Sequence, residues 1–238
     1  MSDDLHEFLA KARGSAVPAR VFRLDDLELR RGLGTQPETS PWGLAAMRGR
    51  LVELSARGAS ATLTMAAELV LEAQRAAEPV AWVVPWSMDP ATATFYPPDL
   101  EHTGIDLAAL VVVKAPSVIA AARASERILR SGAFGLVVLD FGSVDFESNR
   151  ATRLPDQVLG RLVTLAQSHD AVVVCLTDKT PDANSLGSLV SLRVEAMRLR
   201  LPRSSSGNSF EITVRALKDK RRGPGWSKAS KARGPSGM

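Results

Sequence analysis

One loop of the chain has the layout of a phosphate-binding loop but lacks the residues that bind phosphate. The strand-like segment Leu51–Leu54 is followed by Ser55-Ala56-Arg57-Gly58-Ala59-Ser60-Ala61-Thr62 and then by a helical pattern. A working P-loop needs glycines whose backbone N–H groups converge on the phosphates, a lysine, and a Ser or Thr beside that lysine. This loop has a single glycine and no lysine. We therefore predict that Ser60, Ala61 and Thr62 form a degenerate nucleotide site without ATPase activity.

A second candidate is Asp140, which ends the apolar run Gly135–Asp140. An Asp at the end of a buried strand has the form of a Walker B element, which helps to hold Mg²⁺. The alternative is an Asp that caps a turn, and the missing lysine favours it. A related ATPase would place a water-activating Glu after the second strand, where this chain has Pro85 and Trp86.

The remaining reactive residues suggest no catalysis. Cys175 lies inside the apolar run Ala171–Leu176, which predicts an inert core thiol. One cysteine and three histidines provide neither a disulfide framework nor a structural zinc set. We therefore expect no catalytic residue, no metal and no cofactor.

The elements that position these residues alternate between strand and helix from Gly49 onward. The runs at 110–113, 136–140 and 172–177 are continuously apolar, as in strands buried on both faces of a parallel sheet. Leu189–Leu201 and Phe210–Leu217 instead alternate between polar and apolar residues, which predicts a closing antiparallel hairpin. The sequence thus predicts an α/β, doubly wound, mostly parallel sheet over residues 31–217.

An N-terminal helix-strand arm is predicted over residues 1–30. Leu5, Phe8 and Leu9 have helical spacing, and Val21 and Phe22 lie in the alternating segment Arg20–Leu24. The first residues lack the basic and apolar regions of a secretory signal, and no apolar run approaches the roughly 20 residues of a membrane span. We expect a cytoplasmic protein.

The positive charge of the chain is concentrated at its C-terminus. Residues 218–238 hold seven basic residues and one acid, although the whole chain has a net charge of only +4. Their Gly, Pro and Ser content predicts a flexible basic tail, either solubilising or able to bind a partner or nucleic acid. The candidate binding residues are Lys218, Lys220, Arg221, Arg222, Trp226, Lys228, Lys231 and Arg233.

Short motifs in collinear order resemble the RecA recombinase family from Leu5 to Lys220, and most closely its degenerate ImuA branch. They are Val21-Phe22-Arg23-Leu24-Asp25-Asp26, Gly49-Arg50-Leu51-Val52-Glu53-Leu54, Thr62-Leu63-Thr64, Met88-Asp89-Pro90, Gly104-Ile105-Asp106, Asp140 and Arg215-Ala216-Leu217-Lys218-Asp219-Lys220. The resemblance implies a RecA-like fold, with Asp140 at the Walker B position.

Departures from the RecA pattern imply that nucleotide-driven chemistry has been lost. In the resemblance, Ser60 takes the place of the P-loop lysine in a loop about two residues short, and Asp178 or a neighbour replaces a nucleotide-sensing glutamine. The segments Phe141–Leu154 and Asp178–Leu186 correspond to the DNA-gripping loops and look short. In RecA filaments the N-terminal arm packs on the neighbouring protomer, and lysines that match Lys218 and Lys220 approach that neighbour's nucleotide.

The resemblance implies a role in the bacterial SOS response and error-prone translesion synthesis. ImuA proteins act beside ImuB, an inactive Y-family polymerase relative, and beside an error-prone C-family DNA polymerase. RecA and ImuB are the expected partners, bound through the arm and the basic C-terminus. Three alternatives stay open: a DNA-binding module acting through the basic tail, a residual nucleotide site at Asp140 and the Thr62 helix, and a cell-division inhibitor of the SulA kind.

Overall fold

The computed structural model describes residues 40–85, 100, 103–142, 144–146, 153–200 and 209–233. The predicted arm, residues 1–30 with Leu5, Phe8, Leu9, Val21 and Phe22, lies outside the described residues, as does Trp86. Everything below concerns the compact unit that begins at Ser40.

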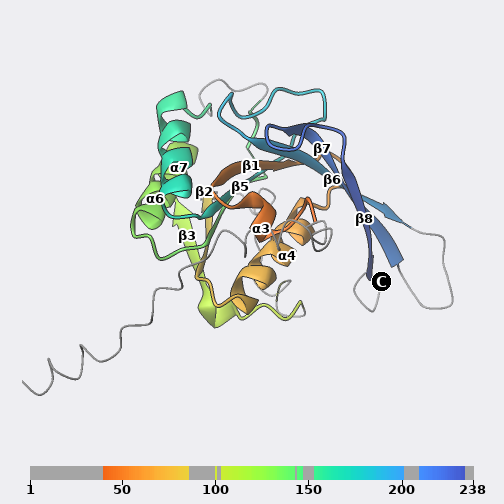
Figure 1. Cartoon of the computed structure of the whole chain (residues 1–238), viewed down its shortest axis with the longest axis horizontal. Helices are drawn as coiled ribbons and strands as arrows, with labels where there is room; N and C mark the ends of the chain where they lie inside the picture. Colours follow the sequence, from red (N-terminus) through yellow and green to blue (C-terminus); the bar gives the residue numbers. More distant parts are fainter. Residues whose placement is uncertain are drawn as a thin grey trace, which may run out of the picture. The chain divides into compact units, whose positions relative to one another are not determined.

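Eight strands form one mixed sheet in the order β3-β2-β4-β5-β1-β6-β7-β8 (Figure 1). Strands β1 to β6 all run in the same direction, β7 is antiparallel to β6, and β8 is antiparallel to β7. The predicted α/β sheet, mostly parallel with C-terminal antiparallel strands, is therefore confirmed. The strands are β1 Arg50–Ser55, β2 Val80–Pro85, β3 Leu110–Ala115, β4 Leu136–Phe141, β5 Val172–Thr177, β6 Leu192–Arg200, β7 Ser209–Asp219 and β8 Ser227–Arg233.

Helices cover both faces of the parallel part of the sheet, which explains its continuously apolar strands. One face packs against α3 (Leu44–Met47) and α4 (Thr62–Arg75), and the other against α6 (Val118–Arg130) and α7 (Asp156–Ser168). A short 3₁₀ turn, η2 (Leu107–Ala109), precedes β3. Strands β1, β4 and β5 are buried along their whole length. Successive side chains of β1 enter opposite cores, with Leu51 toward α6 and α7 and Val52 toward α4.

The prediction of a flexible tail from residue 218 is wrong through residue 233. Asp219 ends β7, and β8 pairs with β7 from Ser227 opposite Arg215 to Arg233 opposite Ser209. The glycines that suggested flexibility serve the connection instead, because Gly223 and Gly225 have φ values of 82° and 97°, which favour glycine. The exposed Lys228 and Lys231 suit β8 as an edge strand, because charges on an edge strand discourage pairing with a further strand.

Trp226 anchors the β7–β8 connection to the core. Its ring is half-buried and packs against the apolar cluster around α4. Its Nε1–H donates to Asp219 Oδ2 over 3.0 Å. Trp226 is therefore a packing residue in this fold, and its role in binding a partner or a base stays a prediction.

In the described part of the chain, no helix has the length and apolar character needed to cross a membrane.

Candidate functional site at the carboxyl edge of the sheet

The loop between β1 and α4 lies where an open α/β sheet binds its ligands, beyond the carboxyl end of a strand. Its backbone is paired with the neighbouring strand β6. The N–H of Ala61 donates to Ala196 O over 3.0 Å, and the N–H of Arg198 donates to Ala59 O over 2.8 Å. Ser60 and Met197 form an antiparallel bridge between the two segments. The loop is thus hydrogen-bonded to the edge of β6 and does not form an open site for phosphate.

The side chains of Ser60 and Thr62 contact each other at the start of α4. Thr62 N–H donates to Ser60 Oγ over 3.2 Å, and the two hydroxyl oxygens lie 3.0 Å apart. The N–H of Ser60 donates to Gly58 O over 2.8 Å. A P-loop directs such backbone N–H groups at the phosphates. In this loop the N–H groups of Ser60, Ala61 and Thr62 already have protein acceptors.

The Asp140 side chain is held by a residue of the neighbouring strand β2 and by a backbone N–H just after its own strand, β4. It is 1% exposed, and its carboxylate accepts from Trp82 Nε1–H over 3.3 Å and from Gly142 N–H over 3.1 Å. The second bond is the turn cap that the sequence favoured over a Walker B role. Strand β5 lies between β4, which carries Asp140, and β1, which leads to Ser60.

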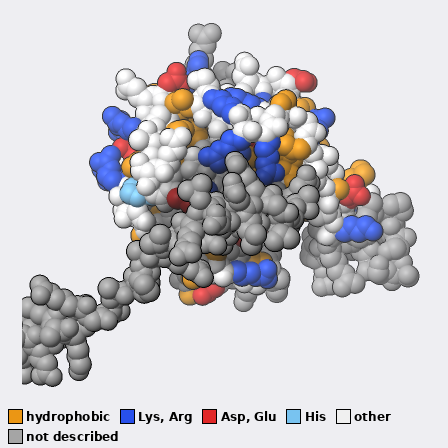
Figure 2. All heavy atoms as spheres, in the orientation of Figure 1, with side chains coloured by type: hydrophobic (Ala, Val, Ile, Leu, Met, Phe, Trp, Pro, Cys, Tyr) orange, Lys and Arg blue, Asp and Glu red, His pale blue; other side chains and the backbone are white. Residues whose placement is uncertain are grey.

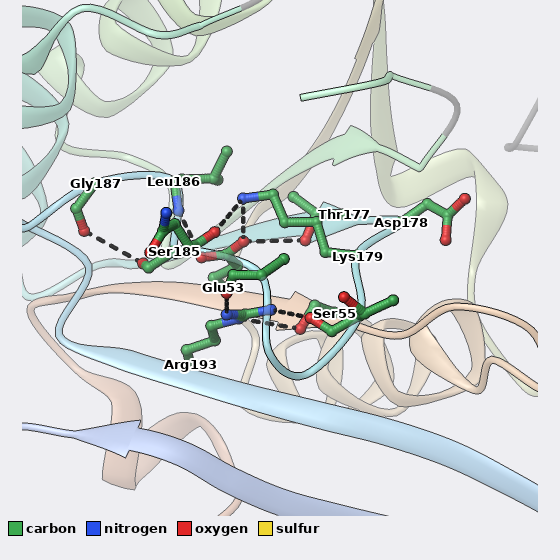
Figure 3. A network of polar contacts seen from close by, with 12 residues as sticks. Glu53, Ser55, Thr177, Asp178, Lys179, Ser185, Leu186, Gly187 and Arg193 are labelled. Carbon is green, nitrogen blue, oxygen red and sulfur yellow. Dashed lines mark hydrogen bonds and ion pairs between the residues drawn. The ribbon is translucent and has the colours of Figure 1, made fainter. Parts of the chain in front are cut away.

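A buried charged network that the sequence analysis missed lies beside this loop (Figure 3). The Glu53 side chain is 0% exposed and lies 2.9 Å from Lys179 Nζ, which is also buried. Glu53 accepts further hydrogen bonds from Thr177 Oγ1 (3.1 Å) and from Leu186 N–H (2.8 Å). Lys179 also donates to Asn184 O over 3.0 Å. Glu53 therefore pins the β5–β6 connection over the end of β1.

Arg193 holds the same connection from β6. Its guanidinium donates to Ser55 Oγ over 3.3 Å, to Thr180 O over 2.7 Å and to Ala183 O. Because a buried guanidinium must satisfy its N–H groups, these acceptors fix the loop's path. Figure 3 shows Arg193 and Glu53 approaching the connection from neighbouring strands.

Asp178, one of the positions suggested for the nucleotide-sensing glutamine, bridges the two loops at this edge. Its side chain is exposed and accepts from Arg57 Nε over 3.3 Å, while Arg57 Nη2 donates to Asp178 O over 2.8 Å. Arg57 belongs to the loop between β1 and α4. The two loops are therefore linked to each other by protein contacts.

The predicted C-terminal binding residues are divided among the end of β7, the turn after it and β8. Lys220 Nζ donates to Ser188 O over 2.6 Å, and Arg221 Nη2 donates to Arg48 O over 3.0 Å. Lys218 is half-buried, and burial, together with the charge of Lys220, lowers its pKa. Lys220, Arg221 and Arg222 in the turn are exposed, as are Lys228 and Lys231 on β8. The C-terminal cations therefore serve partly to attach the turn to the rest of the domain.

Cys175 is buried, and burial raises the pKa of its thiol, as expected for an inert core residue. The described residues contain no group of three His, Cys, Asp or Glu side chains placed to hold a metal ion. One sequence signal marked the missed network: Glu53 is a charged residue flanked by the apolar residues Val52 and Leu54, and charged residues are rarely buried unless paired.

Neither a scan against models of protein families nor a search of curated proteins finds a match to this chain.

Proposed function

We propose that the chain is a non-catalytic, RecA-like accessory protein of SOS-induced DNA damage tolerance, acting in the cytoplasm. It binds RecA, ImuB or both, and recruits or restrains them during translesion synthesis by an error-prone C-family polymerase. The observation that carries the proposal is the pairing of the β1–α4 loop with β6 through Ala61 and Arg198. A domain with this layout, but with its phosphate loop paired inside the sheet, acts by binding, not by turnover.

Three further features support a protein that does not use nucleotide or grip DNA as RecA does. The loop has no lysine for the β- and γ-phosphates. The carboxylate of Asp140 is held by Trp82 and Gly142. The β5–β6 connection, which the RecA resemblance aligns with a DNA-gripping loop, is pinned by the buried Glu53 and Arg193 side chains.

The resemblance assigns partner binding to the N-terminal arm and the basic C-terminus, and our proposal gives the larger role to the arm. Residues 218–233 belong to the sheet and its last turn, and the half-buried Trp226 packs against the core. DNA binding through a flexible tail accordingly has less support. Residues 1–24, with their apolar positions at helical and strand spacing, remain the proposed docking segment for RecA or ImuB.

Biolayer interferometry against RecA, with and without single-stranded DNA and a slowly hydrolysed ATP analogue, and separately against ImuB, tests the proposal. We expect the full chain to bind at least one of them and deletion of residues 1–24 to abolish that binding. The control variant Arg75→Gln changes one exposed side chain of α4, outside the arm and the basic C-terminus, and should bind like the full chain. Failure of the full chain to bind either protein, or full binding after deletion of the arm, would contradict the proposal.

A further inference from the structure

Helix α6 carries a stripe of exposed arginines. Arg123, Arg127 and Arg130 are spaced by four and three residues, so they lie on one face of the helix. All three are exposed, and Arg123 and Arg127 make no hydrogen bond or ion pair within the described part of the chain. Figure 2 shows separate Lys and Arg side chains at the left of the view, on the side of α6 and α7, in addition to a larger group in the middle of the view. Two unpartnered guanidinium groups are therefore available to a ligand on this face.

A groove of about 470 Å³ lies between α6 and α7, next to this stripe. Arg130 and, from α7, Arg161 line it, together with Gly160, Thr164 and Leu165. Leu165 is half-buried and Gly160 has no side chain, so part of the lining is apolar. The groove thus combines an apolar element with a cationic rim.

The acid in this groove is already neutralised. Glu126 has a side chain only 10% exposed and lies 2.8 Å from Arg130 Nη2 and 3.7 Å from Arg161 Nη1. With one carboxylate shared by two arginines, the rim keeps a net positive charge. Arginine matches carboxylates through two parallel N–H donors, and its stem covers apolar surface.

We propose that the α6–α7 groove binds an acidic, amphipathic helical segment of a partner protein. Glutamate or aspartate side chains of that segment would pair with Arg123, Arg127 and Arg161, and an apolar side chain would rest on Gly160 and Leu165. This is the helix-in-groove mode of recognition, in which the positive charge of the groove selects an acidic partner. A nucleic acid strand fits less well, because none of the residues that line the groove is aromatic and could stack on a base. The inference does not rest on the proposed SOS function.

Fluorescence anisotropy with a synthetic peptide tests the groove directly. The probe is a labelled peptide of Glu-Glu-Leu-Leu repeats, about 16 residues long so that it can form a helix. We expect Arg123→Glu/Arg127→Glu to weaken binding at least tenfold. Thr164→Trp, which fills the groove and leaves the arginines in place, should also weaken it. A peptide with Lys in place of Glu should not bind.

The matched control is Lys228→Glu/Lys231→Glu, which reverses two exposed cations on β8, and thermal melting checks that each variant folds. Equal weakening by this control would show a nonspecific charge effect and overturn the proposal. Peptide binding that survives Arg123→Glu/Arg127→Glu, or no binding at about 100 µM peptide, would also overturn it. Binding of a labelled DNA duplex through these arginines, without peptide binding, would identify a nucleic acid surface instead.

Discussion

Arg50 and Asp219 form a buried ion pair that ties β1 to the end of β7. Arg50 Nη2 lies 2.6 Å from Asp219 Oδ1, and the side chains are 2% and 1% exposed. Asp219 also accepts from Arg221 N–H over 2.9 Å and from Trp226 Nε1–H over 3.0 Å. One carboxylate therefore organises the turn that returns the chain into β8.

Asp219→Ala should destabilise the domain by about 3 kcal/mol or more, because it leaves Arg50 as a buried charge without its partner. Urea unfolding followed by circular dichroism measures the loss. Asp182→Ala, at an exposed acid, should change the unfolding free energy by less than about 0.5 kcal/mol. Similar losses in the two variants would show that the Arg50–Asp219 pair has no special role.

The same carboxylate should make stability depend on pH in the acid range. Burial alone raises the pKa of Asp219, but hydrogen bonds from Arg221 N–H and Trp226 and the charge of Arg50 outweigh it and lower the pKa. Its folded-state pKa is thus below the unfolded value of about 3.9. The stabilisation is present above the unfolded value and is lost as pH falls through the folded one.

Asp219→Asn should therefore flatten the fall in unfolding free energy below about pH 4, relative to the wild type. Urea titrations at several pH values between neutral and strongly acidic conditions provide the comparison. A variant with the same acid slope as the wild type would show that Asp219 is not the group responsible.

Strand β8 should be required for the stability of the domain. Truncation after Arg222 removes Trp226 and all of β8, which exposes the apolar surface beneath the indole and leaves β7 as an edge. We expect a clear fall in melting temperature by calorimetry. Truncation after Arg233 removes only residues beyond the strand and is the control. Equal melting temperatures for the two truncated chains would restore the flexible-tail hypothesis.

Hydrophobic patterning was enough to predict the layered α/β sheet, because the apolar runs of β4 and β5 are buried on both faces. It also predicted the pairing of β6 with β7. Patterning missed β8, since Ser227–Arg233 has no apolar period. The position of β8 depends instead on Trp226, which packs against the core, and on Asp219, which pairs with Arg50. Local composition carries no information on such tertiary contacts.

The candidate site was predicted only in part. The missing lysine and the turn-capping Asp140 follow from residue types, which the sequence displays directly. Pairing of Ala61 and Arg198 with their acceptors involves β6, more than 100 residues further along the chain from the loop, so no local pattern could reveal it. The Glu53–Lys179 pair likewise joins residues separated by 126 positions.

Glu53→Gln should destabilise the domain by about 3 kcal/mol or more, since Lys179 would stay buried without its counter-ion. The double variant Glu53→Leu/Lys179→Met removes both charges and should recover much of that loss, because paired buried ions are often replaceable by apolar residues. Urea unfolding of Glu53→Leu, of Lys179→Met and of the double variant gives the coupling energy. A coupling near zero would mean that the two side chains act independently.

Calorimetric titration with Mg-ATP tests most directly whether the β1–α4 loop accepts a nucleotide. With its Ser60, Ala61 and Thr62 N–H groups already bonded to protein acceptors, the full chain should give no binding heat at about 1 mM nucleotide. Ser60→Lys, which restores the lysine alone, should give none either. Saturable binding of Mg-ATP by the unmodified chain, or ATP turnover, would contradict the proposal of a RecA-like protein that acts by binding alone.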